Sequence, residues 1–264
     1  MKHCFITFLT ILFGTNLCLA QEIPLPKVFD ISNKFVFGKY TNGEWKMPAK
    51  YNGKYKVYRR EMLIGMATIK SIPNKSEEPC AADFNYTEKF DNTDKVDYIA
   101  VEGTWNHLPR IPKKVNAQDP KYTKIVQEWC TSKNLKVSTF QITEALQVDV
   151  DNDNNPELII VAKNIEETYG AVENNFSVIL IQKDNQTLEL CSFFMDSETA
   201  KNCTEDTPCF ATIHRFIMCL DINNDSILEI ITADQMHEGM GKTIYQWNAK
   251  DKKFIKILDW GCGV

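Results

Sequence analysis

The sequence predicts a mainly β fold that carries one amphipathic helix and ends in two blade-like antiparallel repeats, a partial or small β-propeller-like arrangement. Three observations predict it. Short runs of β-branched and aromatic residues recur along the chain, a segment near 120–133 has helical spacing instead, and a segment that begins at Ile142 is repeated from His214. The composition agrees, because 44% of the 264 residues are hydrophobic and 25% are charged, as in ordinary globular proteins.

The charge balance argues against one broad class of function. The chain has 30 Lys and Arg residues against 35 Asp and Glu residues, a formal net charge of −5, and its basic residues form no block. Proteins that bind nucleic acid without sequence specificity need a positively charged surface. We therefore expect no nucleic-acid partner.

The first 20 residues predict a secretory signal peptide. A basic start precedes a short apolar run, and Ala20 stands at a position suited to cleavage. A membrane-spanning helix would need about 20 apolar residues, and the run is interrupted at 14–16. A lipoprotein cleaved before Cys18 would need a smaller residue than Leu17. We expect a secreted or periplasmic protein with no integral membrane segment after signal cleavage.

Export makes the cysteines disulfide candidates. Seven lie beyond the predicted signal peptide: Cys80, Cys130, Cys191, Cys203, Cys209, Cys219 and Cys262. A local bridge between Cys203 and Cys209 would close a turn-forming loop, and Cys262 is expected either to pair with Cys219 or to be a buried thiol. Because seven is odd, at least one thiol is free or paired between chains.

A β-rich region is expected over 21–117 and a helix over 118–134. Asp119 and Pro120 suit the N-cap and the first helical position, and apolar residues then recur at helical spacing. Turn-formers such as Asn52-Gly53 separate the strand-like runs of the first region. These runs are Phe35 to Phe37, Tyr55 to Tyr58, Met66 to Ile69 and Tyr98 to Val101.

Two copies of a blade-like unit are expected over 135–264. The segments 142–162 and 214–234 each contain an apolar run, an acidic loop and a second aliphatic run. Each copy then continues into a further pair of strand-like runs, at 176–181 with 188–190 and at 243–247 with 254–258. Each unit therefore predicts a small antiparallel sheet, and two such units pack more readily than one.

The acidic loops place oxygen-bearing side chains at relative positions 1, 3, 5 and 9. These are Asp149, Asp151, Asp153 and Glu157 in the first loop, and Asp221, Asn223, Asp225 and Glu229 in the second. Such hard oxygen donors suit Ca²⁺, and the backbone carbonyls of Asn155 and Ile227 would add to its shell. The loops are not EF-hands, because position 12 is Ile160 or Thr232 where a bidentate Glu belongs. The sequence thus predicts structural calcium.

The pattern resembles the D-x-D-x-D-x-x-x-[DE]-[LI] loops of FG-GAP and VCBS-type repeats, which occur in integrin-like β-propeller domains. The resemblance covers about 142–264 and implies a calcium-binding β-blade in which the eight side chains just named are ligands. One departure is the sixth position, usually Gly, which is Asn154 or Ser226. Asn adopts a positive φ more readily than Ser. The second loop also has fewer carboxylates, so we expect it to bind more weakly. The alternative is that both loops are solvated turns without an ion.

No catalytic motif accompanies the loops. His107, His214 and His237 lack HExxH spacing, and no GxSxG occurs. The favoured function is an exported, non-enzymatic binding or structural module with an extracellular or periplasmic protein or glycan as its partner. The alternative is a secreted hydrolase on a calcium-stabilised β scaffold. A pocket joining a histidine to an acidic or thiol partner would favour the hydrolase, whereas an exposed aromatic or apolar patch would favour binding.

Overall fold

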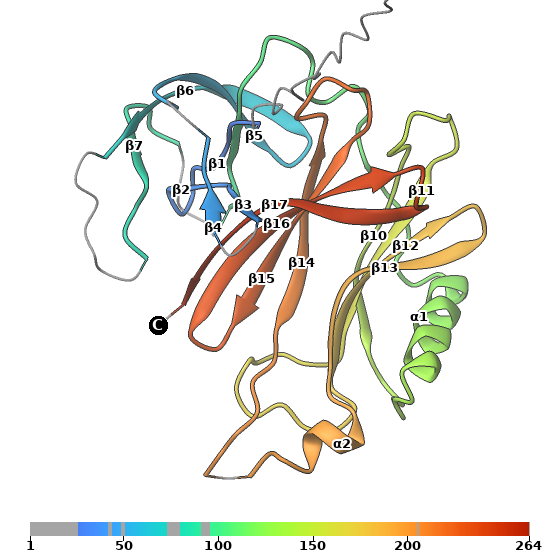
Figure 1. Cartoon of the computed structure of the whole chain (residues 1–264). Helices are drawn as coiled ribbons and strands as arrows, with labels where there is room; N and C mark the ends of the chain where they lie inside the picture. The colour runs from blue at the N-terminus through green and yellow to red at the C-terminus, as the bar shows by residue number, and fades with distance from the viewer. Residues whose placement is uncertain are drawn as a thin grey trace, which may run out of the picture.

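Antiparallel strands make up most of the computed structural model, so the predicted mainly β fold is confirmed (Figure 1). The structure describes residues 26–41, 44–48, 51–72, 80–90, 96–204 and 206–263. The predicted signal peptide lies outside these residues. Within them, no helix has the length and apolar character that crossing a membrane requires.

The N-terminal region forms a six-stranded sheet in the order β2-β1-β8-β5-β6-β7 and a separate β3-β4 hairpin. The strands are β1 Val28–Asp30, β2 Phe35–Val36, β3 Lys39–Thr41, β4 Glu44–Lys46, β5 Gly53–Arg59, β6 Met62–Ser71, β7 Phe84–Tyr86 and β8 Ile99–Val101. The four predicted runs coincide with β2, β5, β6 and β8. Because the strand order is not sequential, this sheet is not a further copy of the blade.

The two repeats form separate antiparallel meanders, as predicted. The first contains β10 Gln141–Val148, β11 Glu157–Lys163, β12 Phe176–Lys183 and β13 Gln186–Phe194, with β9 Lys113–Lys114 paired beside β10. The second contains β14 Ile213–Leu220, β15 Glu229–Met236, β16 Gly239–Asn248 and β17 Lys253–Gly263. In both sheets the acidic loop joins the first two strands of the meander.

The sheets and helix α1 pack in four layers, with the second repeat between the N-terminal sheet and the first repeat (Figure 1). One face of the second repeat contributes Ile231 and Ile244 to a core shared with the N-terminal sheet. The other face contributes Cys219 and Ile230 to a core shared with the first repeat. The sheet of the second repeat is therefore covered on both sides.

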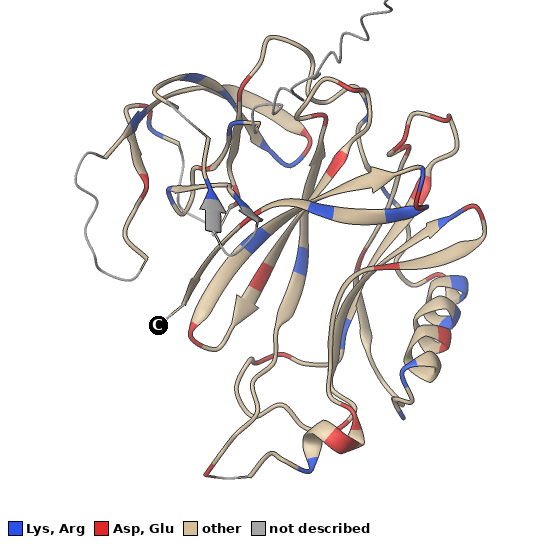
Figure 2. Ribbon diagram, in the orientation of Figure 1, with Lys and Arg blue, Asp and Glu red and all other residues tan. Residues whose placement is uncertain are grey.

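Helix α1, Pro120–Ser132, covers the outer face of the first repeat and confirms the predicted helix. The carboxylate of Asp119 accepts a hydrogen bond from the backbone N–H of Lys121 at 3.0 Å, which caps the helix. Tyr122 and Trp129 are buried against the sheet, whereas the Lys and Glu residues of the helix, coloured blue and red in Figure 2, are exposed. The second helix, α2, is a single turn at Ser197–Ala200.

A buried ion pair joins the N-terminal sheet to the second repeat. The ammonium of Lys242 on β16 lies 2.7 Å from the carboxylate of Asp30 on β1 and 2.6 Å from that of Asp97. Lys242 and Asp30 are both buried. A buried charge without its partner is strongly destabilising, so these contacts disfavour any other docking of the two sheets.

Two disulfides join described residues, Cys80–Cys262 and Cys203–Cys209. The second is the predicted local bridge. The suggested partner of Cys262 was wrong, because Cys219 is a free, buried thiol in the core between the two repeats, whereas Cys262 lies near Cys80. Cys130 and Cys191 are also free.

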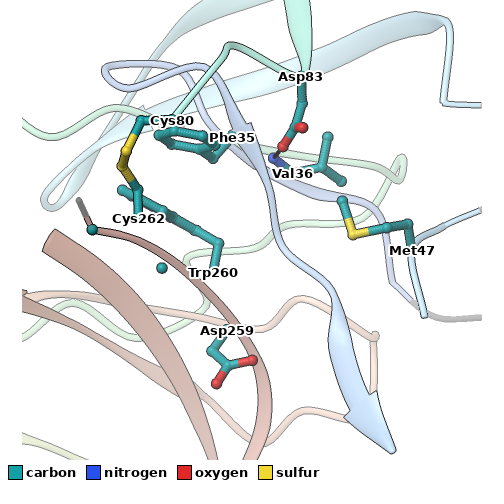
Figure 3. Close-up of a pocket in the computed structure, with 10 residues that line it drawn as sticks. Phe35, Val36, Met47, Cys80, Asp83, Asp259, Trp260 and Cys262 are labelled. Atoms are coloured by element: carbon teal, nitrogen blue, oxygen red, sulfur yellow. Dashed lines mark hydrogen bonds between the residues drawn. A yellow bond between two sulfur atoms is a disulfide. The ribbon is translucent and has the colours of Figure 1, made fainter. Parts of the chain in front are cut away.

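The Cys80–Cys262 bridge lines a cavity of about 300 Å³ (Figure 3). Phe35 stacks on Trp260 beside it, with ring centroids 4.3 Å apart. The two carboxylates that line the cavity are already engaged, because Asp83 accepts the backbone N–H of Val36 and Asp259 contacts a lysine ammonium. We assign the cavity no chemistry.

Removing the long-range bridge with Cys80→Ser/Cys262→Ser should lower the free energy of unfolding by about 2–5 kcal/mol, because the bridge closes a long loop. Its cysteines are 182 residues apart, against 6 for the other bridge. Chemical denaturation of the wild type, this variant and Cys203→Ser/Cys209→Ser measures the losses. The short-loop variant should lose less, and a long-loop variant as stable as the wild type would refute the expectation.

Candidate functional site

The two acidic loops have the same backbone conformation. Both lie at the upper ends of their sheets in Figure 1. Positions 4 and 6 have positive φ in each, at Asn152 (65°) and Asn154 (68°) in the first loop and at Asn224 (64°) and Ser226 (68°) in the second. Ser226 thus adopts a conformation that glycine would take more easily. The duplication seen in the sequence extends to the backbone.

Matching hydrogen bonds close both loops. The N–H of the sixth residue donates to the carboxylate at position 1, at 3.1 Å in the first loop and 3.2 Å in the second. The N–H of the second residue donates to the glutamate at position 9, at 2.7 and 2.8 Å. Asn155 and Ile227, at position 7, donate their N–H groups to the aspartate at position 5. The loops are therefore ordered by their own carboxylates.

The first loop brings its three aspartates together. One carboxylate oxygen from each of Asp149, Asp151 and Asp153 lies within 4.8 Å of the others, close enough to hold a metal ion. Glu157, the fourth predicted ligand, is buried at the start of β11. The sequence therefore identified a group of carboxylates that the fold makes converge.

A lysine that the sequence analysis did not select lies among these carboxylates. The ammonium of Lys183, on β12, is 2.8 Å from Asp151, 2.7 Å from Glu157 and 3.4 Å from Asp153. Its side chain is only 5% exposed and lies over the ring of Trp247. Burial disfavours the charged amine, but the contacts with Asp151 and Glu157 outweigh burial and raise the pKa of Lys183.

The second loop contains amides where the first contains an ammonium. The amide nitrogen of Gln246 donates to Asp225 at 2.8 Å and to Glu229 at 3.0 Å, and that of Asn223 donates to Asp225 at 2.9 Å. In the described part of the chain, no Lys or Arg forms an ion pair with this loop. Burial, joined by the charges of Asp225 and Asp221, raises the pKa of Glu229 to about 8 despite a backbone hydrogen bond.

Arg110 connects the two loops. Its guanidinium donates to the carbonyl of Asp149 and the side-chain oxygen of Asn152 in the first loop, and to the carbonyl of Ser226 in the second at 2.6 Å. It also lies 3.9 Å from the Asp149 carboxylate. Arg110 precedes the repeats in a segment without a recognisable pattern, so nothing in the sequence indicates this role.

The three histidines considered as catalytic candidates lie in different environments. His107 is buried between the Tyr58 hydroxyl and the Glu102 carbonyl, and burial lowers the pKa of His107. Nδ1 of His214 lies 2.7 Å from the Asp234 carboxylate. Its Nε2 has no hydrogen-bond partner among the described residues, and the residue is only 8% exposed. His214 thus has an acidic partner but little access for a substrate.

His237 belongs to an exposed cluster that we call the aromatic patch, formed by Tyr169, Phe210 and His237. The ring of His237 stacks on that of Phe210 at 4.7 Å and lies 5.1 Å from that of Tyr169. Tyr169 is 53% exposed and Phe210 is 50% exposed. The loop that carries Phe210 is closed by the Cys203–Cys209 bridge. The patch could not be predicted from the sequence, because its three residues come from three separate segments.

Replacing Arg110 with Met should lower the free energy of unfolding by about 1–3 kcal/mol, because the loop carbonyls that it bonds lose their donor. Arg60→Met is the matched control, since Arg60 is exposed and lies 3.9 Å from the Glu144 carboxylate. Its loss should be below about 0.5 kcal/mol. Urea denaturation compares the two, and equal losses would show that Arg110 does not hold the loops together.

Comparison with known proteins identifies no relative. No protein-family model, no curated protein and no solved structure matches this chain.

Proposed function

We propose that this chain is an exported, non-enzymatic binding module whose acidic loops use calcium and whose aromatic patch contacts a partner protein. The observation that carries the proposal is the exposure of Tyr169 and Phe210 in one cluster with His237. A cluster of exposed apolar side chains, unlike a single exposed residue, commonly marks an interaction site. The two disulfides suit an oxidising compartment outside the cytoplasm.

The chemistry of the loops supports calcium over other ions. The predicted ligands are all oxygen donors, and Ca²⁺ accepts six to eight oxygens in flexible geometry, whereas Mg²⁺ demands a tighter octahedron. Extracellular calcium modules commonly have a Kd on the order of 10⁻⁴ to 10⁻³ M. Calcium would then stabilise the protein outside the cell, where it is abundant.

The surroundings of the aromatic patch favour a protein partner over a glycan. Val172, on the same loop as Tyr169, is also highly exposed and extends the apolar surface beyond the aromatic rings. The segments that form the patch carry the exposed acidic residues Glu167, Glu173, Asp206 and Glu238 (Figure 2). With Lys201 the exposed basic residue on these segments, an apolar centre flanked by mostly acidic segments fits a partner surface that is apolar and basic.

One observation favours the alternative, a secreted hydrolase. A histidine whose Nδ1 contacts a carboxylate, as His214 contacts Asp234, leaves Nε2 free to act as a base. The ring is buried, however, and the nearby thiol of Cys191 has a pKa raised chiefly by burial, which makes it a poor nucleophile. We therefore favour the binding module.

Calcium at 1 mM should raise the free energy of unfolding by roughly 1.4 kcal/mol per occupied site, for a Kd on the order of 10⁻⁴ M. Magnesium at the same concentration should add much less. Thermal melts in EDTA, Mg²⁺ and Ca²⁺ measure the effect. The same melting temperature in all three would mean that the loops are solvated acidic turns.

Replacing two rings of the aromatic patch, Tyr169→Ser/Phe210→Ser, should abolish capture of the partner from the native extracellular medium without lowering the melting temperature. Ile111→Ser is the control, because it removes a comparably exposed apolar side chain that lies outside the patch. Unchanged capture by the patch variant would contradict the assignment. Loss of capture after glycosidase treatment of the medium would identify a glycan instead.

A further inference from the structure

We propose that this chain is N-glycosylated during export, at Asn85, Asn185, Asn202 and Asn224. The proposal rests on the export part of the proposed function and goes beyond it, because it assigns a covalent modification to four exposed side chains. In the reaction, the side-chain nitrogen of each asparagine loses a proton and forms a bond to the first sugar of a lipid-linked oligosaccharide. The lipid pyrophosphate is the leaving group.

Acceptor sequences for this modification are more frequent in the chain than its composition predicts. Such a sequence, or sequon, is Asn-x-Ser/Thr, in which x is not Pro. Six of the 21 asparagines begin one: Asn74, Asn85, Asn175, Asn185, Asn202 and Asn224. Ser and Thr account for 29 of the 264 residues, so about two sequons would be expected by chance. The excess favours a chain that meets the glycosylation machinery.

Four sequons of the described residues present their asparagine on the surface. Asn85 lies on β7 at the end of the N-terminal sheet, and Asn185 lies in the turn between β12 and β13. Asn202 follows α2, and Asn224 is the fourth residue of the second acidic loop. All four are exposed. A bulky, hydrated glycan on any of them would extend into solvent without entering a core. The sequon at Asn74 lies outside the described residues.

The sequon at Asn175 lies in a different environment. Asn175 is only partly exposed, and its side-chain oxygen accepts the backbone N–H of Val172 at 2.8 Å. The next two residues, Phe176 and Ser177, are fully buried. The hydroxyl of Ser177 accepts the backbone N–H of His214 inside the protein. A glycan on Asn175 would meet packed side chains, so we expect this sequon to remain unmodified.

The conformation of Ser226 gives independent support for the site at Asn224. Ser226 has a φ of 68°, which glycine would adopt more easily. Its backbone N–H and carbonyl bond Asp221 and Arg110, but its hydroxyl forms no hydrogen bond with a described residue. The sequon needs that hydroxyl, whereas the folded loop does not. Modification of Asn224 therefore accounts for a serine at this position.

Enzymatic release of the glycans tests the proposal. The chain is purified from the exterior of its own source cells, denatured, and treated with peptide N-glycosidases F and A in H₂¹⁸O, which labels each asparagine that carried a glycan. A sample without enzyme measures spontaneous deamidation. Mass spectrometry should find the label at Asn85, Asn185, Asn202 and Asn224 and none at Asn175. Label at Asn175, or no label at the four exposed sites, would overturn the proposal.

Variants that keep the asparagine test the sequons themselves. Thr187→Val and Ser226→Gly each remove one sequon hydroxyl, and each should lower the mass of the secreted chain by one oligosaccharide. Ser226→Gly also suits the positive φ, so it should not lower the melting temperature. Thr139→Val is the control, because Thr139 is exposed and outside any sequon. Unchanged masses for both sequon variants would contradict the assignment.

The outcomes separate glycosylation from export. A chain found outside the cell without glycans would overturn this proposal and leave the exported binding module intact. A chain that stays inside the cell would overturn both.

Discussion

Coverage of the second repeat on both faces is the constraint on which the rest of the structure depends. Water does not reach the polar side chains of a sheet that lies between two apolar layers. Burying such a side chain is costly unless it has a hydrogen-bond or ion-pair partner inside the protein. Lys242 contacts Asp30 and Asp97 on the side of the N-terminal sheet, and His214 contacts Asp234. Only the Lys242 contacts cross from the second repeat to the N-terminal region, and another docking of these two layers would leave that buried charge unpaired, whereas His214 and Asp234 are partners within one sheet.

The same constraint acts where the acidic loops leave the sheets. Each loop ends in a glutamate, Glu157 or Glu229, that begins a buried strand and is itself buried. Its carboxylate must be matched by a group from the neighbouring strand. In one repeat that group is the ammonium of Lys183, and in the other it is the amide of Gln246. The two loops therefore share one backbone and differ in the charge of the group beside the glutamate.

Local signals in the sequence predicted the elements and the loops, whereas cross-strand contacts could not be predicted. Alternating and helical periodicity identified the strands and α1, and the duplicated spacing identified the carboxylates that converge at Asp149, Asp151 and Asp153. Lys183 was missed because the register between β11 and β12 brings it to the first loop, and this register cannot be derived from the spacing of the loop. Arg110 was missed because it lies in a segment without a recognisable pattern. The Cys80–Cys262 pairing was missed because disulfide connectivity depends on tertiary packing.

A crystal structure of the chain grown in millimolar calcium tests the central claim most directly. We expect an ion in at least one acidic loop, bound by carboxylate oxygens at about 2.3–2.6 Å. Two loops without an ion under these conditions would contradict the calcium proposal.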